Sequence, residues 1–182
     1  LFFKFQRQKI GLMKNIIPQK FKSLKFKDNR GYFQECFLKK KIKFNPVLSA
    51  LSFSKKNVIR GLHIQLRKKQ KIFITVLNGQ ILDVCIDVNI YSKNFGKIFI
   101  NKLNAGDMLY IPRNYAHGFA ALEKENLIMY QFSEYRDQNS EIGIRYDDKD
   151  LNIKWPVRMP IQSKKDKKNI SFKKFKKIIK KK

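Results

Sequence analysis

The sequence predicts an all-β fold, a jelly-roll barrel with short peripheral helices and a basic C-terminal tail. From about residue 21 to residue 135, short β-type segments alternate with turn signals at the spacing of a sandwich or jelly roll. No long helical period separates these segments, which argues against a doubly wound α/β sheet, because that fold needs helices between its strands. The aromatic content of 13%, led by sixteen Phe, indicates a packed core rather than a disordered chain.

A chain of 182 residues is long enough for one sizeable core and short for two. We therefore expect a single domain over residues 14–170, a possible N-terminal extension at 1–13 and a Lys-rich tail at 171–182. Met13 opens the phrase MKNIIPQKFKSLKF, which already resembles the start of a domain. The preceding residues contain no apolar run long enough for a secretory segment or a membrane span, so a cytoplasmic protein is expected.

Two cysteines, Cys36 and Cys85, lie inside apolar stretches and have no CxxC spacing. They are expected to be buried free thiols in a reducing compartment.

The strand segments follow one another in order between turn signals. Residues 71–77 end at Asn78-Gly79, a strong two-residue hairpin signal, and 80–88 resume the strand, which predicts an antiparallel pair. A second hairpin is expected between 119–122 and 127–132. Between these pairs, a predicted strand at 95–103 is followed by a Gly-Asp turn, then by a strand that ends in Ile-Pro, and then by His-Gly-Phe. This succession is typical of a cupin-like barrel, the double-stranded β-helix.

The net charge of +27 invites a nucleic-acid interpretation, because clustered Lys and Arg bind phosphate. Residues 163–182 alone hold eleven Lys and one Asp. The other basic residues are scattered between apolar positions, which favours a solvated basic surface over a specific nucleic-acid motif. From residue 171, the sequence SFKKFKKIIKKK places Phe and Ile on one helical face and Lys on the other. We expect this helix to dock on its own domain, and a membrane-surface or partner helix is the alternative.

Only two histidines occur, His63 in VIRGLHIQ and His117 in YIPRNYAHGF, each near a predicted strand end. Many cupin barrels bind a metal with three His and one carboxylate, a set that two His cannot supply; no HxH pair is present, and no metal is expected. An imidazole also serves as a general base, because its pKa lies near neutrality. Such a base needs an orienting partner and a cation that holds the negative charge it creates.

Seven phrases together resemble the dTDP-4-dehydrorhamnose 3,5-epimerase family in order and spacing, over about residues 14–166. They are DNRGYFQECF, KKNVIRGLHIQ, QKIFITVLNGQILDVCIDV, SKNFGK, IPRNYAHGF, IRYDDKDLNIKWP and PIQSKKD. The resemblance implies a cofactor-free isomerase that epimerises C3 and C5 of dTDP-4-dehydro-6-deoxy-D-glucose, in dTDP-rhamnose or related polysaccharide biosynthesis.

The resemblance also implies four catalytic roles. His63 is similar to the base that removes the proton beside the 4-keto group, and Asp166 to the carboxylate that orients it. Lys71 resembles the lysine that stabilises the enolate oxygen, and Tyr130 the tyrosine that delivers a proton to the opposite face of the ring. A phenol can supply that proton if a nearby cation lowers its pKa.

The same resemblance implies the substrate contacts and the partners. The positions that match nucleotide-sugar contacts are Arg30, Glu35, Arg60, Phe26 and His117, and His117 is expected either to pair with Asp83 across the barrel or to serve a purely structural hydrogen bond. Arg suits a diphosphate because its planar fork donates in pairs. The family borrows part of its nucleotide pocket from a neighbouring subunit, which implies a homodimer.

The match fails before RGLH, where Leu48-Ser49-Ala50 replaces a Q-x-N pattern that contacts the nucleotide sugar. The nucleotide and sugar are therefore open: a related epimerase could act on another nucleotide-4-keto sugar or at one carbon only. A different class of function is a non-catalytic basic barrel that binds polyanions. A binding module has no reason to keep His63, Lys71, Tyr130 and Asp166 together, and this favours the enzyme.

Overall fold

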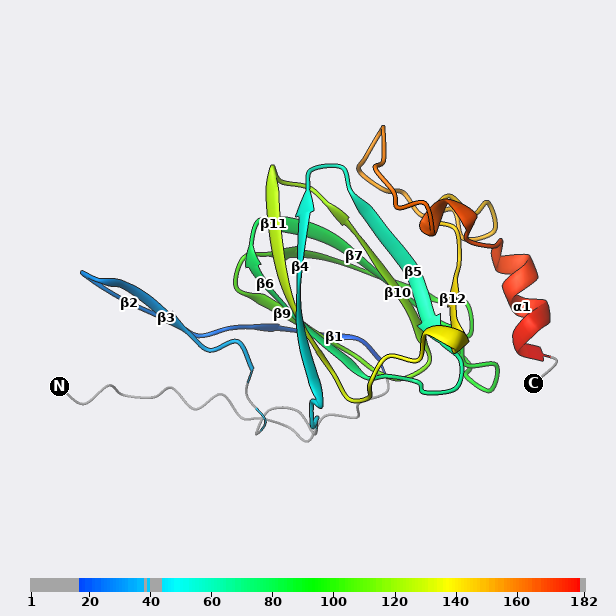
Figure 1. Ribbon diagram of the computed structural model, residues 1–182, viewed down its shortest axis with the longest axis horizontal. Coiled ribbons are helices and arrows are strands. Elements are labelled where there is room, and N and C mark those ends of the chain that lie inside the picture. The colour runs from blue at the N-terminus through cyan, green and yellow to red at the C-terminus, as the bar shows by residue number, and fades with distance from the viewer. Residues whose placement is uncertain (1–16, 38, 40–43, 181–182) are drawn as a thin grey trace.

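A computed structural model describes residues 17–37, 39 and 44–180, and the predicted extension at 1–13 lies outside these residues. The chain forms two five-stranded antiparallel sheets that face each other as a barrel, with a two-stranded arm on one side and a helix on the other (Figure 1). The predicted all-β jelly roll is therefore confirmed.

The first sheet has the strand order β1–β9–β6–β11–β4. Its strands are β1 (Gln19–Lys22), β4 (Leu48–Lys55), β6 (Ile72–Asn78), β9 (Asp107–Ile111) and β11 (Glu125–Phe132). The second sheet has the order β12–β5–β10–β7–β8. Its strands are β5 (Ile59–Gln65), β7 (Gln80–Asp87), β8 (Ile98–Asn104), β10 (Tyr115–Ala121) and β12 (Glu141–Gly143). The arm consists of β2 (Lys25–Asp28) and β3 (Gly31–Gln34), which pair antiparallel.

Both predicted hairpins are wrong, although β6, β7 and β11 lie at nearly the predicted positions and β10 overlaps its predicted range. β6 and β7 lie in different sheets, and so do β10 and β11. The Asn78-Gly79 turn carries the chain across the barrel instead of folding it back on itself. Gly79 has a φ of 83°, and a Cβ there would come within 2.4 Å of the Glu125 carbonyl oxygen. The connection between β10 and β11 therefore packs directly on this turn. The turn residues thus predicted correctly that the chain changes direction, but they predicted incorrectly that β7 pairs with β6.

The space between the sheets is filled by apolar side chains from both. Ile74 and Val76 of β6 pack there with Ile81 of β7 and Ile128 of β11, all without solvent exposure. Because side chains alternate along a strand, Val84 and Ile86 of β7 point to the outer face of the second sheet. That face is covered by C-terminal residues, and β7 is therefore buried on both sides.

The C-terminal helix α1 (Phe172–Lys180) supplies part of this cover. Phe172 and Phe175 are buried in the same cluster as Val84 and Ile86, and the lysines between them are mostly exposed. The expectation that the tail helix docks on its own domain is confirmed. No helix among the described residues is long and apolar enough to cross a membrane.

Both cysteines are free; Cys85 is buried and Cys36 is partly buried.

Candidate active site

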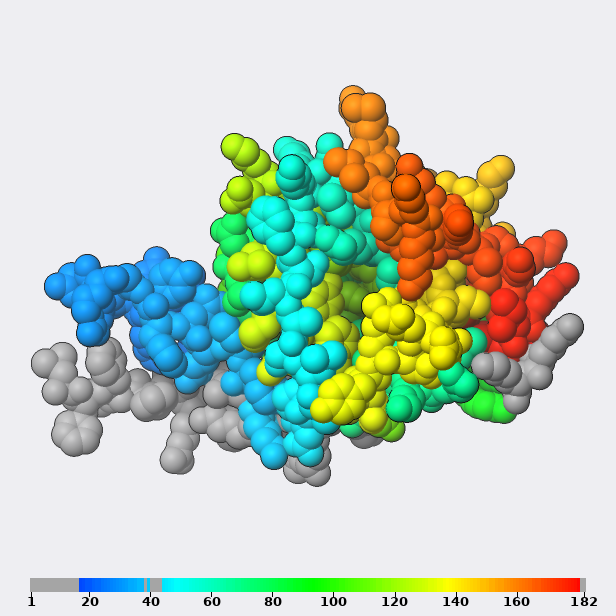
Figure 2. Space-filling view, in the orientation of Figure 1, coloured from blue at the N-terminus to red at the C-terminus, as the bar shows by residue number. Residues whose placement is uncertain are grey.

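A cavity of about 480 Å³ opens between the two sheets. Strands β5 and β10 of one sheet and β4, β6 and β11 of the other contribute to its walls, and the segments around residues 136–141 and 163–166 close one side. Figure 2 looks toward this side of the molecule, where recessed yellow-green atoms of β11 lie between β4 in cyan and the yellow and orange segments. The walls therefore combine the inner faces of both sheets with C-terminal residues that are distant in sequence.

His63 and Asp166 are brought together on the cavity wall. His63 Nε2 lies 2.6 Å from Asp166 Oδ1. Asp166 begins a single 3-10 turn, η3 (Asp166–Lys168), and its backbone N–H donates to Ser163 Oγ at 3.0 Å. Burial by itself raises the pKa of Asp166, but the hydrogen bond and charge of His63 outweigh it and hold the pKa below its usual value. The predicted pairing of His63 with Asp166 is present, and Asp166 is set up to remain a carboxylate.

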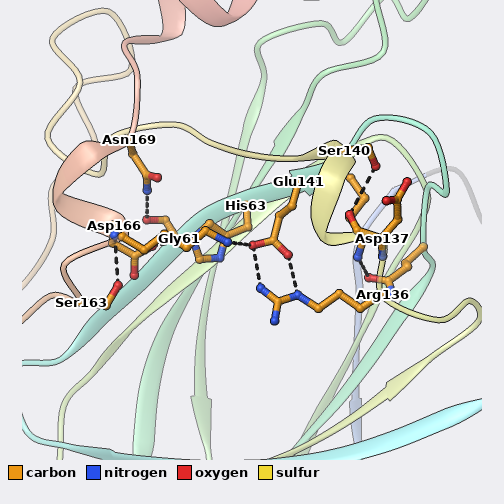
Figure 3. A network of polar contacts seen from close by, with 12 residues as sticks. Gly61, His63, Arg136, Asp137, Ser140, Glu141, Ser163, Asp166 and Asn169 are labelled. Carbon is orange, nitrogen blue, oxygen red and sulfur yellow. Dashed lines mark hydrogen bonds and ion pairs between the residues drawn. The ribbon is translucent and has the colours of Figure 1, made fainter.

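The segment that carries Asp166 is anchored to the strand that carries His63. Asn169 Nδ2 donates to the Gly61 carbonyl oxygen at 3.1 Å, one turn beyond Asp166 (Figure 3). The strand itself is held close to its neighbour, because a Cβ on Gly61 would lie 2.5 Å from the Gly118 Cα of β10. The glycine of the RGLH phrase therefore allows β5 and β10 to approach and places His63 opposite His117 in register.

His117 forms a second histidine–carboxylate pair, with Asp83. The two residues lie on neighbouring strands of one sheet, β10 and β7, and not across the barrel as predicted. His117 Nε2 lies 2.6 Å from Asp83 Oδ2, and the carboxylate has no solvent exposure. Cys85 donates to the other oxygen of Asp83 at 3.3 Å, and burial, foremost, raises the pKa of this thiol. Asp83, Cys85 and His117 place their possible metal-ligand atoms within 4.8 Å of one another. Among the described residues, this is the group that could hold a metal ion. Hydrogen bonds among the three already occupy both oxygens of the carboxylate.

Tyr130 lies on β11, in the sheet opposite His63, and lines the same cavity. Its ring stacks on Phe132 at 5.7 Å and meets His117 edge to face at 6.3 Å. Burial raises the pKa of Tyr130 far above its usual value, the Asp83 charge adds to this, and Arg60 offsets only part of it. The condition that a nearby cation lowers the pKa of this phenol is therefore not met, and the raised pKa keeps the tyrosine protonated at neutral pH.

Lys71 does not line the cavity that holds His63. It directly precedes β6, and its neighbours Gln70 and Ile72 line the cavity. Lys71 borders a separate hollow with Asp87, Arg113 and other residues at that end of the barrel. The role of Lys71 at the enolate, which the resemblance to the family implies, stays a prediction.

The predicted substrate contacts divide into two groups. Arg60 lines the cavity, where its guanidinium donates to Ser54 Oγ at 2.9 Å and to the Phe53 carbonyl oxygen at 3.0 Å. Phe26, Arg30 and Glu35 belong to the arm or its base and do not line this cavity.

The arm extends from the barrel (Figure 1). Its aromatic side chains are exposed. Phe26, Tyr32 and Phe33 are 50%, 60% and 69% exposed, and Arg30 is paired with Asp28 at 2.7 Å. Within one chain the arm therefore does not reach the histidine cavity.

The two positions that depart from the family pattern, Leu48 and Ala50, both line the cavity from β4. This wall is consequently apolar where a Q-x-N pattern would present amides.

Three charged residues of the cavity wall were not singled out from the sequence. Glu141 of β12 accepts two hydrogen bonds from Arg136, at 2.8 and 3.0 Å, and pairs with Lys165 (Figure 3). The only local signal for this cluster is that Lys165 immediately precedes Asp166. Arg136 and Glu141 lie in a stretch without a recognisable motif.

Comparison with known proteins agrees with this geometry. A family profile described as dTDP-4-dehydrorhamnose 3,5-epimerase matches residues 19–174. The dTDP-4-dehydrorhamnose 3,5-epimerase of Shigella flexneri is 37% identical over 152 residues, which cover 78% of this chain and 83% of that protein.

Solved structures of the same kind superpose closely. The dTDP-4-dehydrorhamnose 3,5-epimerase of Bacillus anthracis, with TDP and PPi bound, is 32% identical with a TM-score of 0.82 and covers 90% of this chain and 99% of that chain. The corresponding enzyme of Legionella pneumophila, in complex with dTDP-4-keto-L-rhamnose, is 29% identical with a TM-score of 0.81, and the match covers 88% of this chain and 89% of that chain.

Proposed function

The chain belongs to the dTDP-4-dehydrorhamnose 3,5-epimerase family, and we propose that it inverts C3 and C5 of dTDP-4-dehydro-6-deoxy-D-glucose to give dTDP-4-dehydro-L-rhamnose. The observation that carries this proposal is the His63–Asp166 pair, which faces Tyr130 across one cavity. The reaction is an isomerisation that needs no cofactor, because the proton that leaves each carbon is replaced by another proton.

His63 acts as the general base in this proposal. Its Nε2–H donates to the Asp166 carboxylate, which leaves Nδ1 to take the proton from the carbon beside the 4-keto group. Asp166 fixes the ring orientation and balances the imidazolium charge that forms. A positioned base of this kind contributes about 10² to 10⁴-fold in rate.

Inversion requires that the new proton arrives on the other face of the sugar ring. His63 and Tyr130 lie on β5 and β11, which belong to the two opposing sheets. A sugar ring between the sheets would therefore have the base on one face and the phenol on the other. Because the raised pKa of Tyr130 keeps its proton in place, the phenol is available as a donor to the strongly basic enolate.

The nucleotide part of the substrate is proposed to lie toward Arg60, with the diphosphate on the guanidinium. We further propose a homodimer in which the partner's arm brings Phe26, Arg30 and Glu35 to this end of the cavity. The exposed aromatic residues of the arm support this arrangement, because side chains of this kind are typical of the centre of protein interfaces. The proposed epimerase domain spans residues 14–170, and a cytoplasmic location fits the supply of nucleotide sugars.

Leu48 and Ala50 leave room for a variant of this activity. Their apolar side chains remove two amide contacts from the wall that faces the substrate. The related alternative is an epimerase of the same mechanism that acts on another nucleotide-4-keto sugar.

The test is hydrogen exchange in deuterated water. Incubation with dTDP-4-dehydro-6-deoxy-D-glucose should place deuterium at C3 and C5, measured by NMR, and no exchange at either carbon would contradict the proposal. His63→Ala should abolish exchange while dTDP binding, measured by calorimetry, remains within a few-fold. The Asp137→Asn variant is a matched control, because it removes a nearby ion pair with Arg67 outside the cavity.

A further inference from the structure

We propose that Asp83, Cys85 and His117 form a binding site for a divalent cation that prefers sulfur and nitrogen ligands, such as Zn²⁺. The three residues bring a carboxylate, a thiol and an imidazole together, and their possible ligand atoms lie within 4.8 Å of one another. The inference goes beyond the proposed epimerase function, because it rests on these ligand atoms and not on the substrate.

The strand geometry directs the three side chains to one face of the second sheet. Asp83 and Cys85 are two positions apart on β7, so they point to the same side of the sheet. His117 of β10 lies directly opposite Cys85 in the antiparallel register. Directly opposed residues are close neighbours, with Cβ atoms about 4.5–5.5 Å apart. Two paired strands therefore hold three different donors around one point.

The distances between the donor atoms are near those of a metal site. Asp83 Oδ1 lies 3.3 Å from Cys85 Sγ, and Asp83 Oδ2 lies 2.6 Å from His117 Nε2. In a tetrahedral zinc site the ligand atoms are about 3.3–3.6 Å apart, since Zn–S is about 2.3 Å and Zn–N about 2.0–2.1 Å. The first distance already fits, and the second has to increase by roughly 0.7 Å, which a small side-chain rotation provides.

The hydrogen bonds among the three residues are the contacts that a metal replaces. Binding forms a bond from the metal to Cys85 Sγ, and the thiol proton passes to solvent. His117 binds through Nε2 as a neutral imidazole, with its proton on Nδ1. Burial raises the pKa of the Cys85 thiol, so this proton leaves in exchange for the metal rather than before it.

Charge and donor type select the kind of cation. The thiolate and the carboxylate supply two negative charges, and a divalent cation cancels both. Asp83 and Cys85 have no solvent exposure, so a complex without net charge is the one that can be buried there at low cost. Thiolate and imidazole ligands favour Zn²⁺ over Mg²⁺ and Ca²⁺, which prefer oxygen ligands.

The cavity gives a metal both a route to this site and room for a fourth ligand. His117 is 8% exposed and lines the cavity that holds His63. The side of the cluster toward the cavity lies beside Tyr130, whose ring meets His117 at 6.3 Å. The expectation of no metal rested on the three-His set of many cupin barrels, whereas this cluster is a different set that needs one His. Because a bound metal takes up His117 Nε2 at the wall of the proposed sugar site, we expect it to inhibit the epimerase.

The test measures Zn²⁺ binding to the reduced, chelator-treated protein by calorimetry, and Cd²⁺ binding by the ultraviolet absorption band of a thiolate–cadmium bond. The wild type should bind one Zn²⁺ per chain and develop the band with Cd²⁺. Cys85→Ala should lose the band and bind Zn²⁺ at least about 100-fold more weakly, because loss of partners outside the ligand set already costs about 10- to 100-fold. Cys36→Ala is the matched control and should behave as the wild type, since it removes the other free cysteine, which contacts the Gln34 carbonyl oxygen.

Unchanged Zn²⁺ binding by Cys85→Ala, or no cadmium band in the wild type, would overturn the inference. His63→Ala keeps all three donors of the cluster and removes one donor of the His63–Asp166 pair, so it should bind Zn²⁺ as the wild type does. Loss of binding in this variant would place the metal at that pair and contradict the proposal. If Cys85→Ala unfolds, as judged by circular dichroism, Cys85→Ser decides, and a cadmium band retained in that variant would have the same meaning.

The effect on activity is a separate measurement, and it alone rests on the proposed function. Deuterium exchange by the wild type and by Cys36→Ala should fall as Zn²⁺ is added and recover when EDTA removes it. Cys85→Ala should keep its own metal-free rate, and equal inhibition of this variant would contradict the inference. A wild type that binds Zn²⁺ but exchanges no deuterium without it would overturn the proposed function and support the metal site.

Discussion

Glu141 is a single carboxylate shared by two cations at the edge of the cavity, and this makes it sensitive to acid. Its side chain is 8% exposed, whereas Arg136 and Lys165 are about half exposed. The cations lower its pKa in the folded protein to about 2, below the value near 4.3 of an unfolded chain. A carboxylate with a depressed pKa stabilises the folded state above its unfolded pKa and loses that contribution as the pH falls through the folded value.

The first prediction concerns stability against pH for Glu141→Gln. At pH 6–7 the wild type should be more stable than the variant by on the order of 1–3 kcal/mol, after allowance for the exposed cations. The difference should shrink between pH 5 and pH 2, because the wild-type carboxylate becomes protonated. Urea unfolding at each pH measures it, and a difference that does not change with pH would contradict the assigned ionisation.

Among the individual residues of the cavity, some could be predicted from the sequence and others could not. His63, Asp166 and Tyr130 belong to recognisable phrases, and all three line the cavity. The role of Lys71 stays a prediction: Lys71 borders a separate hollow with Asp87 and Arg113, and its neighbour Ile72 lines the cavity. Glu141 and Lys165 were missed because their contact joins residues 24 positions apart that share no motif.

Strand β5 carries His63, the proposed base, and its close approach to β10 depends on glycine. Gly61 has a φ of 112°, and a Cβ there would lie 2.5 Å from Gly118 Cα and 2.7 Å from the His117 carbonyl oxygen. Both contacts are with backbone, which cannot move aside without disturbing the register of His63 against His117.

The second prediction compares Gly61→Ala with Gly31→Ala. Both glycines have positive φ, but a Cβ on Gly31 meets nothing within 4 Å. Gly31→Ala should cost only the backbone strain, about 1 kcal/mol, whereas Gly61→Ala should cost about 3 kcal/mol or more from strain and overpacking together. Chemical denaturation of both variants tests this, and equal costs would show that β5 and β10 can separate.

The same elements show where prediction of the fold stopped. Alternating apolar residues and turn signals located β6, β7 and β11 to within about two residues, whereas β10 begins at Tyr115, four residues before the predicted start. The pairing of these strands was wrong, because a turn dipeptide such as Asn78-Gly79 specifies a change of direction and not the sheet in which the next strand lies. Strand partners in this barrel are fixed by contacts between distant parts of the chain: β1 pairs with β9, with Gln19 opposite Tyr110.

At the scale of the whole molecule, the arm is notable because its aromatic side chains are exposed in a single chain. Its exposed aromatic residues lie away from the barrel core, and the proposed dimer gives them a partner. The +27 charge of the chain works against association, so apolar contact at the arm has to outweigh repulsion between two basic subunits.

The third prediction is that Phe33→Ser weakens the dimer. The wild type should sediment with the mass of two chains at micromolar concentration, and the variant should dissociate at concentrations at least about ten-fold higher. Its exchange activity should fall on dilution and return as protein concentration rises. Tyr91→Ser, which removes another highly exposed aromatic residue outside the arm, should behave as the wild type. A monomeric wild type with full activity would contradict the proposed dimer.

The pairing of His63 with Asp166 joins residues 103 positions apart, and Tyr130 is contributed by a strand between them. While the protein is being synthesised, the proposed base His63 is therefore made long before Asp166, and the proposed proton donor Tyr130 is made between them. Domains commonly begin to fold from the N-terminus during synthesis, at about 5–20 residues per second. A ribosome-bound chain that ends before residue 166 contains His63 but cannot form its pair with Asp166. Deuterium exchange into the substrate could be measured for chains stalled on the ribosome at successive lengths. Exchange should begin only at lengths at which the segment with Asp166 has left the ribosome, and this length would show when the cavity is completed.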